Sequence, residues 1–543
     1  MKKIVFLMLI FFIIVNVFLL NYIVKAELLS DRIIQRMGIH GNNHIEAFKR
    51  IDKINSDLLK GFYKLRNYQP AWCKETRIYQ ITYDLLTIIK NSYQNGLNPD
   101  DYAYTYLYYL IKGLEADINN DKVELDRLLK LELLLTEIYF KFSNDLLYGV
   151  SKHKGYDLGY QEIDLPVLLN NALETDNLRE TIKNLDPIQP LYARMQLALK
   201  RLLKIFNDGG WPLISDKIEL KKGVCHQAVL DLRERLLLSG DLKPENNHAG
   251  LLFDDKLAEA VALFQLRHGL PASEILDEKT LTALNTSVEE RIRQLKINMD
   301  RLRWLPQKRE DIYIVINIPD FKLEVMKDYS SIFESRVIVG DKNNQSPLFR
   351  DEIEYIVINP YWKITDNIAK YEILPKLKND PAYLDRNKIK ILESWHNDSK
   401  IVLPESIEWH NISPEKFTYK LRQEPGIFNS LGQIKFIFPN SYQVYLHDTP
   451  YKYLFNYPDR AKSHGCIRVE KPFSLASCLL GKDWDEEEVA EIIRLNKRKV
   501  INLKEKIPIY LVYLTSWVDE NGIIQHRDDV YNLDQELYEK LKI

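Results

Sequence analysis

The sequence has little cysteine, with four in 543 residues. Four thiols in a chain of this length do not make the disulfide framework of small secreted domains. Short paired spacings such as Cys-x-x-Cys, which many zinc sites use, are also missing. Cys73, Cys225 and Cys478 are predicted to be small buried hydrophobes, and the sequence leaves open whether Cys73 and Cys225 pair.

An excess of charge of either sign is missing too, since 75 Lys and Arg stand against 77 Asp and Glu. No basic run stands out, so nucleic acid is not expected as a partner. The hydrophobic fraction of 45% is that of a folded globular protein. A length of 543 residues indicates several domains.

One long apolar stretch is present over residues 4–24, directly after Lys2 and Lys3. Its length approaches the ~20 residues that span a bilayer, and the two lysines favour a cytoplasmic N-terminus. Residues 1–26 are therefore predicted to be a membrane anchor, and a signal peptide cleaved after Val24-Lys25-Ala26 is the alternative. Either one exports the rest of the chain to the cell envelope. In a bacterium with two membranes, the domains would be periplasmic, either anchored in the inner membrane or secreted.

The next regions have helical patterns. Residues 27–216 are rich in Leu, Ile, Lys and Tyr with helical apolar spacing, which predicts a helical domain. Residues 217–290 predict three short helices, the third capped by Asp277. Residues 291–310 predict a connecting helix that is closed by Pro306.

Short apolar runs over residues 311–535 predict a β-rich domain, either a sheet or a sandwich. One predicted strand covers residues 442–447, and Asp519-Glu520-Asn521-Gly522 predicts a hairpin turn. Prolines among charged and helical pieces interrupt the pattern over about 363–422. This interruption predicts an insertion in the β domain, for which a surface loop without a role is the alternative.

The chemistry of the chain centres on Ser463-His464-Gly465-Cys466-Ile467-Arg468, together with His447 upstream. A free thiol with a pKa near ~8.5 is only slightly ionised at neutral pH, and a nearby imidazole can take its proton. Gly465 lets backbone N–H groups approach a developing oxyanion. These residues therefore predict thiol acyl transfer, with the thiol held ionised by an adjacent ring nitrogen.

Other interpretations of the same residues remain open at this point. One alternative is that Cys466 is an inert small hydrophobe. Another alternative is a zinc site with His447, His464 and Cys466 as ligands, since zinc accepts both residue types. Arg468 either forms an ordinary surface ion pair or positions the loop or a substrate carboxylate. Trp362 either lines the site or lies in a core.

The motif resembles the L,D-transpeptidase catalytic domain of the YkuD type, in which a histidine precedes Ser/Thr-His-Gly-Cys. The flanking segments match as well: Arg422-Gln423-Glu424-Pro425-Gly426, Leu431-Gly432, Lys435-Phe436, Phe438-Pro439-Asn440 and Val444-Tyr445-Leu446-His447-Asp448-Thr449-Pro450. The resemblance implies that Cys466 is the nucleophile and His447 the proton donor and acceptor. It implies that His464 is a structural or orienting residue and that His464 and Gly465 belong to the oxyanion loop. It further implies substrate contacts by the following residues: Ser463, Arg468, Trp362 and Tyr445.

Segments upstream resemble other domains of the large L,D-transpeptidases. Those similar to the N-terminal scaffold domain are Arg66-Asn67-Tyr68-Gln69-Pro70-Ala71-Trp72, Gly96-Leu97-Asn98-Pro99-Asp100-Asp101-Tyr102 and Gly209-Gly210-Trp211-Pro212. Those similar to the peptidoglycan-binding domain are Ala260-Val261, Phe264-Gln265 and Gly269-Leu270, with a purely structural spacer as the alternative. The expected fold is thus multidomain α+β, with a helical scaffold, a small three-helix peptidoglycan-binding domain and a β-rich catalytic domain whose insertion caps the site like a lid.

The resemblance implies a peptidoglycan L,D-transpeptidase that forms 3→3 cross-links through a cysteine acyl-enzyme, without a cofactor or metal. The expected partners are peptidoglycan stem peptides, namely a tetrapeptide donor and an amine acceptor. Carbapenem β-lactams are expected as covalent inhibitors. The alternatives are an L,D-carboxypeptidase that uses water at the same site, a non-catalytic wall-binding scaffold, and a zinc peptidase. Acceptor specificity and oligomeric state stay open.

Overall fold

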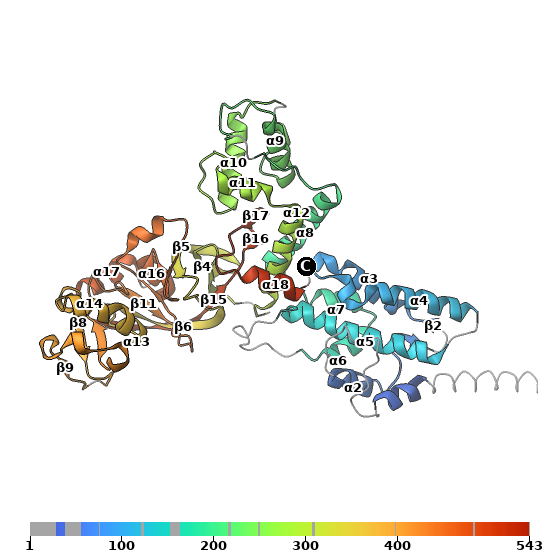
Figure 1. Cartoon of the computed structure of the whole chain (residues 1–543). Helices are drawn as coiled ribbons and strands as arrows, with labels where there is room; N and C mark the ends of the chain where they lie inside the picture. The colour runs from blue at the N-terminus through green and yellow to red at the C-terminus, as the bar shows by residue number, and fades with distance from the viewer. Residues whose placement is uncertain are drawn as a thin grey trace, which may run out of the picture.

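The computed structural model describes residues 29–37, 56–74, 77–120, 124–151, 163–215, 219–247, 250–306, 310–396, 398–481 and 484–541. The predicted anchor or signal peptide over residues 1–26 lies outside these described residues. Within them, no helix combines the length and the apolar character needed to cross a bilayer. The chain forms three lobes that meet around helix α12 (Val288–Arg303) (Figure 1).

The scaffold lobe, on the right of Figure 1, is a set of helices packed around α5. Its elements are α2 (Ser56–Leu65), β1 (Cys73–Lys74), β2 (Arg77–Ile78), α3 (Gln80–Lys90), α4 (Tyr104–Asn119), α5 (Leu125–Tyr148), α6 (Leu165–Glu174) and α7 (Leu178–Lys183). Buried Glu132 of α5 accepts hydrogen bonds from the Trp72 N–H at 2.9 Å and the Tyr63 hydroxyl at 3.1 Å. Cys73 is buried beside this carboxylate, as the sequence predicted.

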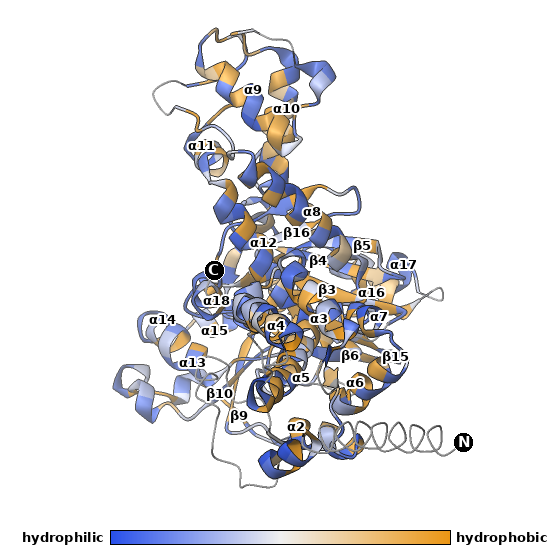
Figure 2. Ribbon diagram, turned by 90° about the vertical axis from the view of Figure 1, so that its right-hand side faces the viewer, coloured by the Kyte–Doolittle hydropathy of each residue, from blue (hydrophilic) through white to orange (hydrophobic). Residues whose placement is uncertain are grey.

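The second lobe, at the top of Figures 1 and 2, holds three short helices, as predicted: α9 (Ala228–Ser239), α10 (Asp255–Arg267) and α11 (Glu278–Asn285). Asp277 caps α11 by accepting a hydrogen bond from the Thr280 N–H at 2.8 Å. The prediction that Cys225 is buried is wrong, because this thiol is exposed. Cys73 and Cys225 are both free thiols.

The predicted connecting helix is a central packing element rather than a simple linker, because α12 is buried along most of its length. Arg303 of α12 pairs with Asp300 at 3.2 Å, and Asp300 accepts a hydrogen bond from the scaffold Val150 N–H at 2.8 Å. Arg301 pairs with Asp534 of the C-terminal helix α18 (Leu533–Leu541) at 2.6 Å. Helix α8 (Pro190–Asn207), at the end of the predicted scaffold region, packs on α12 in the same central core.

The second lobe is docked on the β-rich domain through a predicted hairpin, formed by β16 (Ser516–Val518) and β17 (Ile524–His526). His268, just after α10, stacks on Phe264 at 3.9 Å and on His526 at 4.9 Å between ring centroids. Arg267 pairs with Asp241 at 2.5 Å and donates to the Ile524 carbonyl at 3.3 Å. The contact is therefore apolar and aromatic at its centre and hydrogen-bonded around it.

The β-rich domain is a nine-stranded sheet in the order β13-β5-β14-β12-β11-β6-β15-β3-β4. A further β4–β5 pairing closes this sheet on itself, so its interior forms one hydrophobic core. The strands are β3 (Ile312–Asn317), β4 (Lys322–Lys327), β5 (Ser330–Gly340), β6 (Phe349–Ile358), β11 (Ile434–Ile437), β12 (Leu446–His447), β13 (Ala461–Ser463), β14 (Ile467–Val469) and β15 (Lys499–Val512). Two helices pack against the same core: α16 (Pro472–Leu480) and α17 (Glu486–Arg494).

One predicted strand is shorter than expected. The sequence predicted a strand over residues 442–447, but β12 holds only Leu446 and His447. Gln443 has a positive φ of 57°, and the Asn440 side chain bonds the Val444 backbone on both sides, so the chain turns here instead of extending. This turn brings residues 442–445 to the edge of a cleft.

The insertion is a subdomain with a core of its own. It carries the helices α13 (Asp366–Ile368), α14 (Leu374–Asn379) and α15 (Tyr383–Arg386). Its second sheet, in the order β7-β10-β8-β9, is built from β7 (Trp362–Lys363), β10 (Lys420–Gln423), β8 (Ile389–Leu392) and β9 (Ile401–Val402). The sequence predicted helical pieces but not this sheet, because its strands are too short to show alternation.

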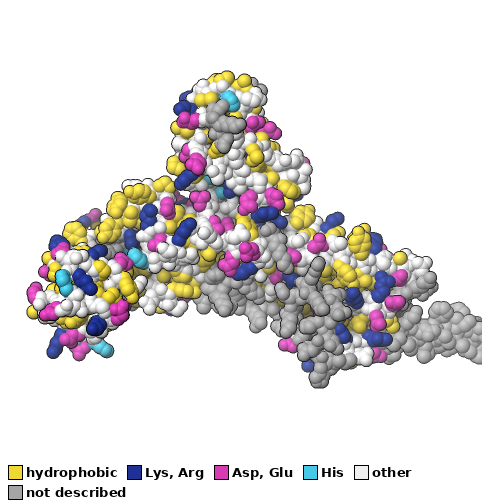
Figure 3. All heavy atoms as spheres, viewed as in Figure 1, with side chains coloured by type: hydrophobic (Ala, Val, Ile, Leu, Met, Phe, Trp, Pro, Cys, Tyr) yellow, Lys and Arg dark blue, Asp and Glu magenta, His cyan; other side chains and the backbone are white. Residues whose placement is uncertain are grey.

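On the face seen in Figure 3, basic and acidic side chains are interspersed over all three lobes. This mixture agrees with the near-neutral net charge of −2. Local charge in the cleft therefore depends on which side chains the fold brings together there.

Candidate active site

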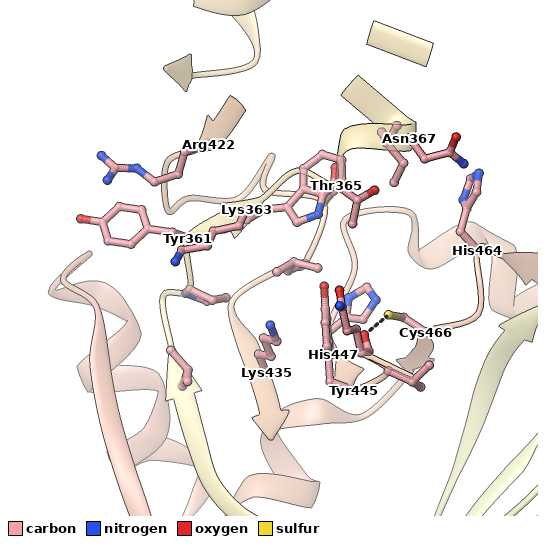
Figure 4. A pocket seen from close by; sticks show the side chains of 18 of the residues that line it. Tyr361, Lys363, Thr365, Asn367, Arg422, Lys435, Tyr445, His447, His464 and Cys466 are labelled. Atoms are coloured by element: carbon pink, nitrogen blue, oxygen red, sulfur yellow. Dashed lines mark hydrogen bonds between the residues drawn. The ribbon is translucent and has the colours of Figure 1, made fainter. Parts of the chain in front are cut away.

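A cleft with a volume of about 990 Å³ lies between the insertion and the catalytic sheet (Figure 4). It brings together most of the residues that the sequence singled out: Trp362, Tyr445, His447, Ser463, His464, Cys466 and Arg468. Gly465 lies within the same turn as Cys466. Residues 362 and 468 are far apart in the chain, so the cleft is a product of the tertiary fold.

The turn between β13 and β14 presents Cys466. Gly465 has a φ of +103°, a conformation that side chains with a Cβ rarely adopt. The Ser463 hydroxyl accepts from the Gly465 N–H at 3.2 Å and donates to the Cys466 carbonyl at 2.5 Å. The Ser346 hydroxyl donates to the Gly465 carbonyl at 2.7 Å. The turn is thus held from both sides, and the sulfur of Cys466 points into the cleft toward the His447 ring (Figure 4).

Two details differ from what the resemblance implies. Ser463 lies in the wall of the cleft but is buried, with its hydroxyl used within the turn, which favours a bracing role over substrate contact. The Gly465 N–H is likewise committed to Ser463. Among the described residues the Cys466 N–H has no hydrogen-bond acceptor, so this amide is free to face a developing oxyanion.

His447 is buried, with 4% of its surface exposed, at the end of β12. Its Nδ1 lies 2.5 Å from the Asp448 carbonyl oxygen. A carbonyl only accepts, so Nδ1 carries the proton and Nε2 of the neutral ring is left as the basic nitrogen. Burial, reinforced by the Arg468 charge, lowers the pKa of His447 to about 3. The ring is therefore neutral at physiological pH.

Burial raises the pKa of the Cys466 thiol above its ordinary value, and hydrogen bonds from Tyr445 and the charges of Lys435 and Arg468 oppose this only in part. The directions of both shifts favour a neutral thiol beside a neutral imidazole in the resting protein. The sequence-based expectation of a thiol held ionised is corrected accordingly. The proton would leave the thiol during attack, when Nε2 of His447 can accept it.

His447 lies in the middle of a row of residues across the sheet. The register pairs it with Arg468 of β14 on one side and with Lys435 of β11 on the other. Paired residues of neighbouring strands point to the same face with their Cβ atoms about 5 Å apart. The imidazole is therefore flanked by two cations, which is why both lower its pKa.

Arg468 forms no ion pair among the residues that the structure describes, and its Nε is buried without a hydrogen-bond partner. The alternative of an ordinary surface ion pair is thus not what the structure shows. An unpaired guanidinium at a cleft wall is suited to a carboxylate, for which its forked geometry fits.

The second histidine of the motif links the turn around Cys466 to the insertion. His464 Nε2 lies 3.1 Å from the Glu372 carboxylate, and the two side chains are 49% and 43% exposed. The His464 ring points toward the insertion and away from the sulfur (Figure 4). This placement agrees with an orienting role and not with a role as the base.

Two aromatic residues complete the wall beside the sulfur. Trp362 is half-buried and lines the cleft from β7, although it also packs on the core of the insertion. The Tyr445 ring lies 5.7 Å from the His447 ring, at an interplanar angle of 58°. Both are thus placed where a bound peptide would contact them.

Sequence reasoning missed Lys435 and Glu372 as site residues. Lys435 alternates with buried Ile434 and Phe436, which is the pattern of any strand with one solvated face. Only the fold shows that the insertion covers this face. For the zinc alternative, no group of three or more His, Cys, Asp and Glu side chains within the described ranges is arranged to hold a metal ion.

A thiol and a neutral imidazole that share one covered cleft are the groups that acyl transfer through cysteine requires. Comparison with protein families agrees with this class. Residues 311–494 match the model described as "L,D-transpeptidase catalytic domain" (YkuD), residues 57–199 match "Scaffold domain", and residues 225–284 match "Putative peptidoglycan binding domain". The chain therefore carries a YkuD-family L,D-transpeptidase catalytic domain joined to a scaffold and a peptidoglycan-binding domain, as the motifs predicted.

A curated relative from Haemophilus influenzae, named "Putative L,D-transpeptidase", is 36% identical over 301 residues, which is 54% of this chain and 60% of that protein. The matched region thus spans three fifths of the relative's length. A solved structure titled as an L,D-transpeptidase (Yku) from Stackebrandtia nassauensis is 14% identical with a TM-score of 0.22, covering 55% of this chain and 96% of that one. A likeness at this level supports no inference about this chain.

Proposed function

We propose that this protein is a peptidoglycan L,D-transpeptidase of the cell envelope that joins two stem peptides by a 3→3 cross-link through a thioester on Cys466. The observation that carries the proposal is the row of Arg468, His447 and Lys435 beside the sulfur, under the insertion. This row supplies a neutral base between two cations, next to a thiol in a covered cleft.

In the proposed first step, Nε2 of His447 takes the thiol proton as the sulfur attacks the carbonyl carbon of the third stem residue, meso-diaminopimelate in the expected substrate. The Cys466 N–H faces the oxyanion. The bond to the terminal D-alanine breaks, and His447 returns the proton to the leaving amine. A thioester and free D-alanine result.

In the proposed second step, the side-chain amine of another stem peptide attacks the thioester. His447 accepts the amine proton and gives it to the departing sulfur, so the thiol is regenerated and one amide bond is formed. The insertion, tied to the catalytic turn by His464 and Glu372, helps to keep water from the thioester. The carbapenem sensitivity implied by the family follows from the same acylation of Cys466.

The test is intact-mass spectrometry of the protein after incubation with a tetrapeptide stem, and separately with a carbapenem. An adduct on Cys466 is expected with both, together with a cross-linked dimer when an amine acceptor is added. Cys466→Ala should form neither. Cys478→Ala, a matched change at a half-buried thiol in α16, should behave as the unchanged protein. Shortened stems without dimers would replace the proposal by an L,D-carboxypeptidase. Stem peptides that remain unchanged would refute the proposal in favour of a non-catalytic scaffold.

A further inference from the structure

Besides Arg468, the cleft contains a second cationic position, to which the proposed chemistry assigns no substrate contact. Lys435 is half-buried on β11, and its Nζ lies 3.4 Å from the centroid of the Tyr445 ring. Within the described residues Lys435 forms no ion pair, and no carboxylate is among the groups that shift the pKa of its ammonium. Lys435 is separated from Arg468 by His447, so it lies on the opposite side of the catalytic row.

Two further cations surround this position. Lys363 of β7 and Arg498, just before β15, line the same cleft. Lys363 lies over the Trp395 ring at 5.2 Å, and neither side chain forms an ion pair in the part of the chain that the structure describes. They come from the insertion and from the sheet, so the two walls of the cleft converge on Lys435 with charges of the same sign.

The surroundings of Lys435 also act on its own ionisation. Burial lowers the pKa of Lys435 to about 8, with repulsion from Lys363 and Arg498 acting in the same direction. Glu372 is the single carboxylate among the described residues that line the cleft, and it is paired with His464. Cations that lie close together without a carboxylate between them repel one another, and an anionic ligand relieves this repulsion.

We propose that Lys435, Lys363 and Arg498 form a carboxylate-binding subsite that receives a carboxylate of a peptide substrate on the side of His447 opposite to Arg468. The inference rests on the proposed function and deepens it. An ammonium held over an aromatic ring beside a second cation can donate charge-assisted hydrogen bonds to a carboxylate. The two cationic positions, one on each side of the sulfur, would fix the direction in which a peptide lies across Cys466.

The test compares stem peptides with a free carboxylate and with the same carboxylate amidated, in the donor and, separately, in the acceptor. The rate constant for Cys466 acylation is followed by mass spectrometry, and dimer formation by chromatography. The variants are Lys435→Met, Lys435→Arg and the double change Lys363→Met with Arg498→Gln. Lys506→Met, an exposed lysine paired with Glu354 on the sheet, is the control.

We expect Lys435→Met to lower the rate with the free carboxylate about tenfold or more, since hydrogen bonds to charged groups have this size. The ratio of the rate with the free carboxylate to the rate with the amidated peptide should fall in this variant, because the ratio cancels any effect that Lys435 has on the thiol or on His447. Lys435→Arg should retain the preference for the free carboxylate, and the double change should weaken it. If amidation of the donor erases the effect in the acylation step, the ligand is the donor stem. If amidation of the acceptor erases it in dimer formation, the ligand is the acceptor stem.

A loss that is the same for free and amidated peptides would overturn the inference, because Lys435 would then act only on the thiol. An unchanged rate in Lys435→Met would overturn it as well. In both cases the proposed function would stand, because acylation of Cys466 is still observed. Unchanged protein that forms no thioester with either peptide would refute the proposed function and the inference together.

Discussion

Lys435 lies directly opposite His447 in the ladder between β11 and β12, so the imidazole of the cleft has a lysine on the strand next to it. Arg468 occupies the corresponding position on its other side. A ring between two cations resists protonation, and burial acts in the same direction. The relationship keeps the His447 ring neutral in mild acid, and so able to accept a proton.

The pH profile of acylation should reflect this environment. His447 is in its basic form above its lowered pKa of about 3, and the thiol of Cys466 stays protonated up to a raised pKa. We therefore expect kcat/KM for thioester formation to show no fall between pH 7 and pH 5.5. A fall with a midpoint near ~6.5, the ordinary value for histidine, would contradict the flanking-cation account. His447→Gln should reduce the rate by about 100-fold or more, since general bases contribute on this scale.

The conformation of Gly465 predicts a separation of stability and activity. Gly465→Ala places a Cβ 3.6 Å from the Gln345 carbonyl oxygen, so space is adequate, but the φ of +103° is strained for alanine. We expect a stability loss of about 1–3 kcal/mol, with a loss of activity of about 100-fold as the Cys466 amide shifts. Gly481→Ala is the matched control, with a φ of +86° and open space around it. It should lose similar stability in thermal unfolding and keep its activity.

The contact between His464 and Glu372 predicts an effect on the fate of the thioester. Both side chains are about half exposed, so Glu372→Gln should change the free energy of unfolding by less than about 1 kcal/mol. The insertion would be held less firmly over the turn, and more thioester should be lost to water. The measurement is the ratio of hydrolysed tripeptide to cross-linked dimer, which should rise. Glu405→Gln, an exposed carboxylate of the same insertion, should leave the ratio unchanged.

The buried histidine stack at the lobe contact predicts acid sensitivity of the fold. Burial, with repulsion from nearby arginines, lowers the pKa of His268 and of His526 well below the ordinary value. Below about pH 6.5 the unfolded chain takes up protons that these folded rings refuse, so stability is lost as the pH falls. The free energy of unfolding should fall as the pH drops from 7 to 5, by up to about 1.4 kcal/mol per pH unit for each histidine. The thermal unfolding midpoint should fall with it.

His268→Phe tests the origin of that loss. The change keeps a ring between Phe264 and His526 but removes one titrating group. The fall of the thermal midpoint between pH 7 and pH 5 should become shallower. His410→Gln, on the exposed surface of the insertion, should leave the pH dependence as it is. An equally steep fall in His268→Phe would assign the acid sensitivity to other groups.

The helices and strands were predicted best where a pattern is local. Asp277 and the hairpin turn at Asp519 were found because capping and turn chemistry depend on a few neighbouring residues. The strand over residues 442–447 was predicted too long, because alternation there is broken by side-chain hydrogen bonds of Asn440 that the hydrophobic pattern does not show. The insertion's own sheet was missed, since each of its strands is only two to four residues long.

The sequence by itself determined which reactive groups the chain carries and where the turn around Cys466 lies, because that spacing and the need for glycine at 465 are properties of adjacent residues. The tertiary structure alone decided the charge state of His447 and the presence of Lys435, Lys363 and Arg498 in the cleft. Strand pairing places Lys435 and Arg468 beside the ring, and the insertion buries that face. Electrostatics and desolvation depend on distances through space, and these are not contained in the spacing along the chain.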